Sequence, residues 1–158
     1  MNELERLGFV SNTPVKTVKP FEKWQGSKLK DWEFRMKVLS VGDLIEIARA
    51  TAGDNVFALL QYSTKIHTLA KAIILINGVS VITDDELKQY REDHKSPEFT
   101  AYDYALVYLK GQNEFVINNL FYAYEQIQQE YVKEVLGTDE LPEALKKELE
   151  SKNVPAGN

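Results

Sequence analysis

Two histidines, His67 and His94, are the side chains of this chain best suited to acid–base chemistry near neutral pH. A nucleophile needs such a base beside it, and a metal site needs several ligands at set spacings. His67 follows Ile66 in an apolar stretch, and His94 ends a run of charged residues, so neither belongs to a catalytic or metal-binding motif. We expect a packed histidine and a solvated one, and we predict no catalytic residues and no metal ligands.

Three adjacent carboxylates, Asp84, Asp85 and Glu86, offer no better chemistry. They follow Thr83 in a capping-box pattern, and neighbouring positions in a first helical turn do not share one face. The chain also lacks phosphate-loop, dinucleotide-binding, zinc-protease and EF-hand patterns. Because it has no cysteine, thiolate nucleophiles, cysteine zinc sites and disulfides are excluded. We predict a protein that is not an enzyme and needs no cofactor.

The length and net charge of the chain restrict the kinds of binding partner that we expect. A chain of 158 residues is about one domain and can bury a core of its own. Its net charge of -5 has the opposite sign to that of a typical nucleic-acid binder. Its N-terminus has no signal-peptide pattern, and its longest apolar run, from Ala72 to Ile76, is too short to span a membrane. We therefore expect no membrane partner and consider nucleic acid unlikely.

Residues 1–30 have the composition of an extended basic arm. Prolines at 14 and 20 interrupt the segment, yet apolar residues recur along it, which is unusual for a disordered linker. Such an arm could dock on an acidic surface, including that of a neighbouring copy, or be a solvated tail. Its candidate partner-binding residues are Phe9, Lys16, Lys19, Phe21, Lys23, Trp24, Lys28 and Lys30.

The remaining pattern predicts a mainly α fold: a helical domain at 31–137 with one or two short strands, then a short C-terminal helix and tail at 138–158. Residues 31–39 alternate as a half-buried strand. The expected helices run from Val41 to Thr51, from a cap at Asp54 to Ile76, from Thr83 to Lys95, from a cap at Ser96 to Gly111, from Asn113 to Leu136 and from Thr138 to Asn153. A short extended piece at 79–82 could pair with the 31–39 strand or with an equivalent extended piece nearby.

Tyrosines are concentrated in the last two long helices. Six of them occupy positions that cannot all lie on one core stripe, so some should reach the surface. Tyrosine combines an apolar ring with a polar tip and is common at protein interfaces. We select Tyr104, Tyr108 and Tyr122 as candidate partner-binding residues. The alternative is that these rings only cover the core.

The stretch from His67 to Val79 (HTLAKAIILINGV), followed by a capped polar helix and the tyrosine-rich helices, resembles small tail and baseplate proteins of long-tailed bacteriophages. The resemblance covers about residues 32–136. It implies a structural or assembly protein of the virion that binds other tail proteins and copies of itself, without catalytic residues. The alternatives are a tail-assembly chaperone that does not stay in the particle and a cytoplasmic helical adaptor with one soluble partner.

Overall fold

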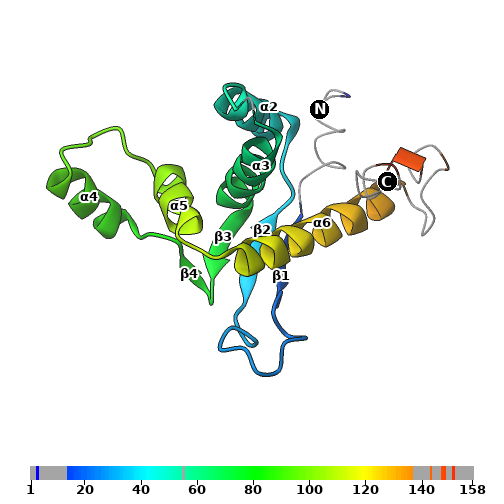
Figure 1. The fold of residues 1–158 in the computed structure, drawn as a ribbon. Coiled ribbons are helices and arrows are strands. Elements are labelled where there is room, and N and C mark those ends of the chain that lie inside the picture. Colours follow the sequence, from blue (N-terminus) through cyan, green and yellow to red (C-terminus); the bar gives the residue numbers. More distant parts are fainter. Residues whose placement is uncertain are drawn as a thin grey trace.

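The computed structural model describes residues 14–54 and 56–136, together with Glu3, Glu143, Lys147, Glu148 and Ser151 (Figure 1). The two long described segments contain a four-stranded antiparallel sheet and five helices, which confirms the mainly α fold with short strands. In chain order the elements are β1 (Val15–Val18), β2 (Phe34–Lys37), α2 (Val41–Thr51), α3 (Phe57–Ala72), β3 (Ile73–Ile76), β4 (Val79–Ser80), α4 (Asp84–Asp93), α5 (Ala101–Lys110) and α6 (Glu114–Leu136).

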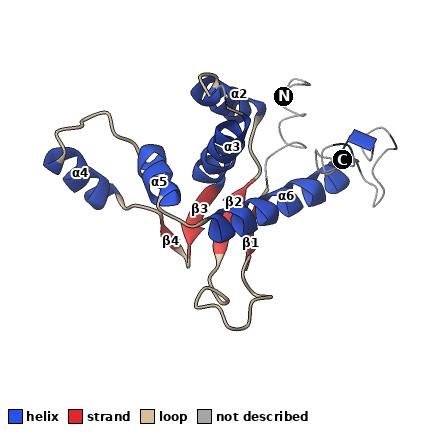
Figure 2. Cartoon of the chain, viewed as in Figure 1, coloured by secondary structure: helices blue, strands red, loops and turns tan. Residues whose placement is uncertain are grey.

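The sheet has the order β1-β2-β3-β4, so every strand pairs with its neighbour in the sequence (Figure 2). Strand β2 is central and shows the predicted alternation, with Phe34 and Met36 buried and Arg35 exposed. Because side chains alternate across a strand, this pattern turns one face of the sheet toward the helices.

The prediction of an extended arm reaching residue 30 is wrong for its described part. Residues Val15 to Val18 pair with β2, and Phe21 is fully buried with its ring 6.2 Å from that of Phe34. The β-branched residues of this segment suit the open edge of β2, and burying Phe21 favours the folded position. Residues 1–13, apart from Glu3, lie outside the described residues.

The helix predicted to reach Ile76 ends at Ala72, because Ile73–Ile76 forms strand β3. Three isoleucines in this segment favour a strand, and β2 provides its partner. The turn that follows has positive φ at Asn77 and Gly78, which suits asparagine and glycine and allows β4 to pair back onto β3. Of the extended piece at 79–82, Val79 and Ser80 pair with β3, the nearby strand, and not with the 31–39 strand.

Two helix starts, those of α2 and α4, were predicted correctly. Ser40 caps α2 with Asp43, and Thr83 caps α4 with Glu86. The predicted caps at Ser96 and Asp54 are wrong. Helix α5 begins at Ala101 behind a Thr100–Asp103 capping box, which outcompetes the Ser-Pro start five residues earlier. Val56 occupies the N-cap of α3 and makes no side-chain hydrogen bond there.

The core lies between the sheet and helices α3, α5 and α6. Helix α3 contacts α2, α5 and α6, and α6 crosses the sheet (Figure 1). On α6, Ile117, Leu120, Tyr124 and Ile127 are buried, whereas Val135 near the end of the helix is exposed. Helix α4 buries no residue, as its polar sequence predicted. The predicted C-terminal helix from Thr138 to Asn153 lies largely outside the described residues.

Candidate protein-interaction surface

Helix α2 exposes an apolar stripe. Val41, Leu44, Ile45 and Ala48 are three or four residues apart and all are exposed, with Val41 at 73%. The buried residues of the helix, Ile47 and Thr51, lie on the side next to this stripe. A surface helix normally turns such a stripe toward the core, so this stripe lacks a cover among the described residues.

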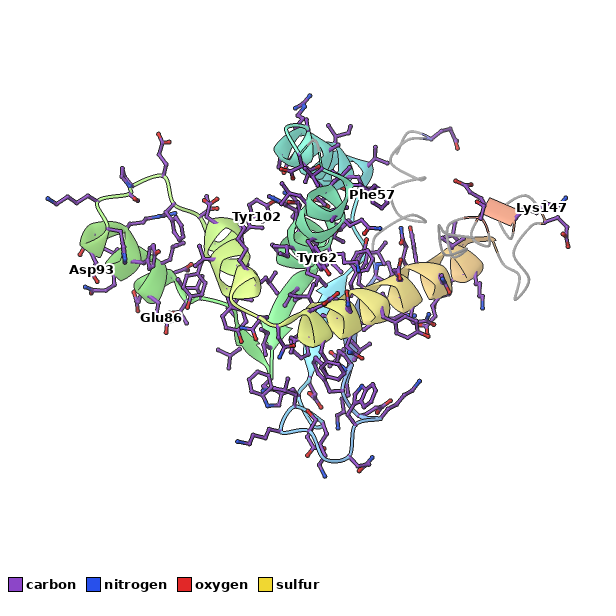
Figure 3. All side chains as sticks on the ribbon, viewed as in Figure 1. Phe57, Tyr62, Glu86, Asp93, Tyr102 and Lys147 are labelled. Atoms are coloured by element: carbon purple, nitrogen blue, oxygen red, sulfur yellow. The ribbon has the colours of Figure 1, made fainter. Side chains whose placement is uncertain are left out.

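The first two turns of α3 extend the apolar area. Every residue from Val56 to Tyr62 is exposed, and Phe57 leaves 70% of its surface in solvent. The segment from Val56 to Thr64 carries no charge. Helices α2 and α3 pack against each other, and Figure 3 shows Phe57 near the α2 end of α3. We define the α2–α3 apolar surface as Val41, Leu44, Ile45, Val56, Phe57, Leu59 and Leu60.

Polar contacts mark where this surface ends. Tyr62 donates a hydrogen bond from its hydroxyl to Glu114 of α6, and this bond raises the pKa of Tyr62. One turn further on, Lys65 Nζ donates to Asn118 Oδ1 at 2.8 Å. From Tyr62 onward, side chains of α3 are therefore hydrogen-bonded to α6. The apolar side chains before Tyr62 are exposed and are not covered by other described residues.

The histidine with the most buried setting sits in a polar contact between helices. His67 Nδ1 shares a hydrogen bond with the Tyr102 hydroxyl, joining α3 to α5. Burial, and then the Lys110 charge, lower the pKa of His67, while burial raises the pKa of Tyr102. Both pKa shifts favour a neutral imidazole, whose Nδ1 accepts a hydrogen bond from the protonated Tyr102 hydroxyl. His67 is thus hydrogen-bonded between helices, and exposed His94 stacks on Tyr90 at 3.9 Å.

A cation adjoins the same contact. Lys71 Nζ lies 4.6 Å from the centroid of the Tyr102 ring and also pairs with Glu46 of α2. The contacts among Lys71, Glu46, Tyr102 and His67 therefore connect α2, α3 and α5. Among the described residues, no group of three His, Asp or Glu side chains is placed to hold a metal ion.

Two of the predicted partner-binding lysines contact acids of their own chain. Lys16 Nζ lies 2.8 Å from Glu130 and 3.1 Å from Glu134, and these hydrogen bonds raise the pKa of Lys16. Lys19 lies 4.0 Å from Glu33. The acidic surface expected to receive the arm is, for Lys16, the α6 helix of the same molecule. The side chains of Lys23 and Lys28 are exposed and that of Lys30 is half-buried.

The predicted aromatic anchors are divided between core and surface. Phe21 is buried and unavailable to a partner in this fold. Trp24 remains 48% exposed, although its ring lies 5.1 Å from that of Phe115 and its Nε1 donates to Asn119 Oδ1 at 3.3 Å. Phe9 lies outside the described residues.

The three selected tyrosines do not form one group. Tyr122 on α6 is 58% exposed and Tyr108 on α5 is 40% exposed, whereas Tyr104 is half-buried with its ring edge-on to Tyr90. No ring contact joins the three within the described part of the chain. Tyr124 is buried, and its hydroxyl accepts a hydrogen bond from the Leu39 amide.

An apolar pocket of about 130 Å³ lies between the sheet, α5 and α6. Buried Ala105 on α5 leaves room opposite Phe34 and Ile73, and Tyr108 and Gln112 also line the pocket. The remaining wall residues are Leu29, Trp32, Leu69, Ile76, Val81, Leu109, Val116 and Leu120.

Both helices were predicted from the sequence, but none of the seven residues of the α2–α3 apolar surface was selected as a partner-binding residue. One signal was present: the stretch from Val56 to Thr64 has no charged residue on any side of the helix. A helix that is apolar on most sides must be covered by something. Nothing in the sequence indicates whether that cover is the same chain or another.

Comparison of the chain with protein-family models, with characterised proteins and with solved structures finds no match. Within the described residues, no helix is both long and apolar enough to cross a membrane.

Proposed function

We propose that this chain is a structural or assembly protein of a phage tail or baseplate, and that it acts by binding protein through the α2–α3 apolar surface. One observation carries the binding role: seven large apolar side chains on two adjacent helices are 36–73% exposed. They expose on the order of 600 Å² together, the upper end of the largest patch on a typical monomer. Patches of this kind mark interaction sites.

The chemistry of the surface favours protein over other partners. Burial of apolar side chains supplies the driving force, and an uncharged helix segment has no ion to desolvate. Phe57, the most exposed aromatic side chain of the surface, suits the role of an anchor that fills a pocket on the partner. The rim offers polar side chains, among them Tyr62 and Arg49.

The phage setting rests on the sequence resemblance. The segment that carries it, His67 to Val79, forms the end of α3, strand β3 and the turn into β4. It therefore includes the helix end that holds α3 on the sheet and so fixes the direction in which the α2–α3 apolar surface faces. The alternative role is that of a tail-assembly chaperone that uses the same surface but leaves before the particle is complete.

A complementation experiment tests this role. A phage with an amber mutation in the gene for this chain would be supplied with wild-type protein, Phe57→Asp or the matched control Val107→Asp, which changes an exposed apolar residue of α5. We expect wild type and Val107→Asp to restore infectious tailed particles and Phe57→Asp to fail. Particles that form normally without the chain would refute the role.

Mass spectrometry of purified particles separates the two forms of the proposal. Peptides of this chain in finished tails support a retained structural subunit. Peptides found only in assembly intermediates support the chaperone.

A further inference from the structure

We propose that the partner seated on the α2–α3 apolar surface is a second copy of this chain, related to the first by a two-fold axis. This inference rests on the proposed function only in using the same surface. A two-fold contact joins one patch to itself, so it requires a surface that is complementary to its own copy.

The charges around the surface satisfy that requirement. The chain carries a net charge of -5, so two copies repel each other unless they meet at a neutral area. The acids of α2 beside the stripe already have partners: Asp43 caps its own helix and lies 3.9 Å from Lys37, and Glu46 pairs with Lys71. The seven residues of the surface carry no charge, and its rim includes one cation, Arg49.

The size of the surface also fits. Its exposed apolar area, on the order of 600 Å², approaches the roughly 800 Å² that each partner of a standard interface buries. Rim residues such as Arg49, Gln61 and Tyr62 supply the remainder. An interface with this apolar centre and polar rim has the usual composition of a homodimer.

The arrangement of helices α2 and α3 suggests how two copies would pack. Helices α2 and α3 form a pair joined by a short loop, and both expose apolar residues (Figure 1). Two such pairs related by a two-fold axis pack as a four-helix arrangement, the common way to bury apolar helix faces. The C-terminal end of α3 continues into strand β3 and is held at the sheet. The N-terminal end of α3 and helix α2 are therefore the parts that would contact the second copy.

Residues 1–13 of the same chain are the competing occupant. The Pro14 carbonyl accepts a hydrogen bond from the Val38 amide, three residues before α2 begins, so Pro14, the first residue of the described segment, lies near α2. A test of the dimer must therefore distinguish cover by another molecule from cover by the same one.

Sedimentation equilibrium of the full chain, from about 1 to 100 μM, provides the test, since weak homodimers dissociate within this range. We expect a species of twice 18.1 kDa for wild type and for the control Val107→Asp. Ile45→Asp places a carboxylate in the centre of the contact and should weaken association by at least about 100-fold. A Leu44→Ser variant provides a milder change, and circular dichroism checks that each variant is folded.

A spin label on a single introduced cysteine locates the contact, because the natural chain has none. With one label per chain, any dipolar coupling is between molecules. We expect a short distance from Arg49→Cys at the rim, a longer one from Asp85→Cys on α4, and no coupling when Ile45→Asp is added. A wild type that stays monomeric throughout, or a dimer that Ile45→Asp leaves intact, would overturn the proposal.

Failure of the dimer proposal can be distinguished from failure of the proposed function. A monomeric wild type whose Phe57→Asp variant still fails in complementation would mean that the surface binds a different protein. A monomer with normal complementation by Phe57→Asp would indicate that the chain covers its own surface.

Discussion

Helix α6 and the α2–α3 pair both carry many apolar residues, but these residues lie in opposite environments. On α6, Leu120 and Ile127 are each 2% exposed against the sheet and α3. On the first turns of α3, Leu59 is 51% exposed and Phe57 is 70% exposed. Helical spacing places apolar residues on one side of a helix but does not specify what covers that side.

The difference in neighbours explains the difference in environment. Helix α6 crosses the sheet and receives Phe21 and Trp24 from the loop after β1, whose rings pack against Phe115. The outer turns of α3 extend past both the sheet and α6. The same kind of residue therefore stabilises the fold in one region and remains exposed to solvent in the other.

The largest expected effect is a difference in unfolding free energy between alanine substitutions in the two regions. Leu120→Ala removes buried contacts and should lower the free energy of unfolding by about 2–5 kcal/mol. Leu59→Ala, at half-exposed Leu59, should change it by less than about 0.5 kcal/mol in the monomer. Urea unfolding of both variants in the Ile45→Asp background measures this without association. Equal losses would mean that α3 is covered within the chain.

Filling the apolar pocket should have a smaller and opposite effect. Ala105→Leu adds carbon atoms to the space of about 130 Å³ between α5 and the sheet. We expect the free energy of unfolding to rise by about 1 kcal/mol, the usual gain from cavity filling. Ala101→Leu, on the exposed start of the same helix, is the control and should be close to neutral. A marked loss in Ala105→Leu would show that the wall residues cannot move apart.

The features that could be predicted from the sequence are those determined by neighbouring residues. The capping boxes at Ser40 and Thr83 involve contacts three residues apart, so the sequence is sufficient to place both helix starts. The alternation in β2 is equally local. Strand β3 is different, because it depends on pairing with Phe34 and Arg35, about forty residues earlier.

The candidate site was harder to predict for the same reason. The burial of Phe21 and the pairing of Lys16 with Glu130 depend on α6, more than ninety positions away along the chain. The exposure of Phe57 results from the lack of any described neighbour to cover it. A propensity or periodicity pattern contains no information about either, and the selection of Trp24, Tyr108 and Tyr122 as partner-binding residues, which rested on residue type alone, stays a prediction.

Helix capping gives a third way to compare the regions. Val56 occupies the N-cap of α3 without a side-chain hydrogen bond, whereas the N-caps of α2, α4 and α5 are capping boxes. Val56→Ser should therefore stabilise the monomer by about 0.5–1 kcal/mol. It also removes an apolar side chain from the proposed contact, so it should weaken self-association. Unfolding and sedimentation measurements that moved in the same direction would contradict the assignment of Val56 to an interface.

The smallest effect should come from the pH dependence of His67. Burial, and then Lys110, lower the pKa of His67 in the fold below its ordinary value of 6.5, so the unfolded chain binds the proton first. Above pH 6.5 both states are neutral at this site and it adds no pH dependence. As the pH falls below 6.5 the fold should lose stability, until the pH is below the folded pKa and the loss is complete.

Variants at this contact isolate the histidine. His67→Gln keeps a polar side chain beside the Tyr102 hydroxyl but cannot titrate, so its unfolding free energy should fall less between pH 7.5 and 5.5 than that of wild type. His94→Gln provides the matched control, because His94 is exposed and stacks on Tyr90 away from this contact. If His67→Gln and wild type lost equal stability, the His67–Tyr102 contact would not depend on a neutral imidazole. The apolar α2–α3 surface contains no titrating group, so self-association should follow this change only as far as the fold does.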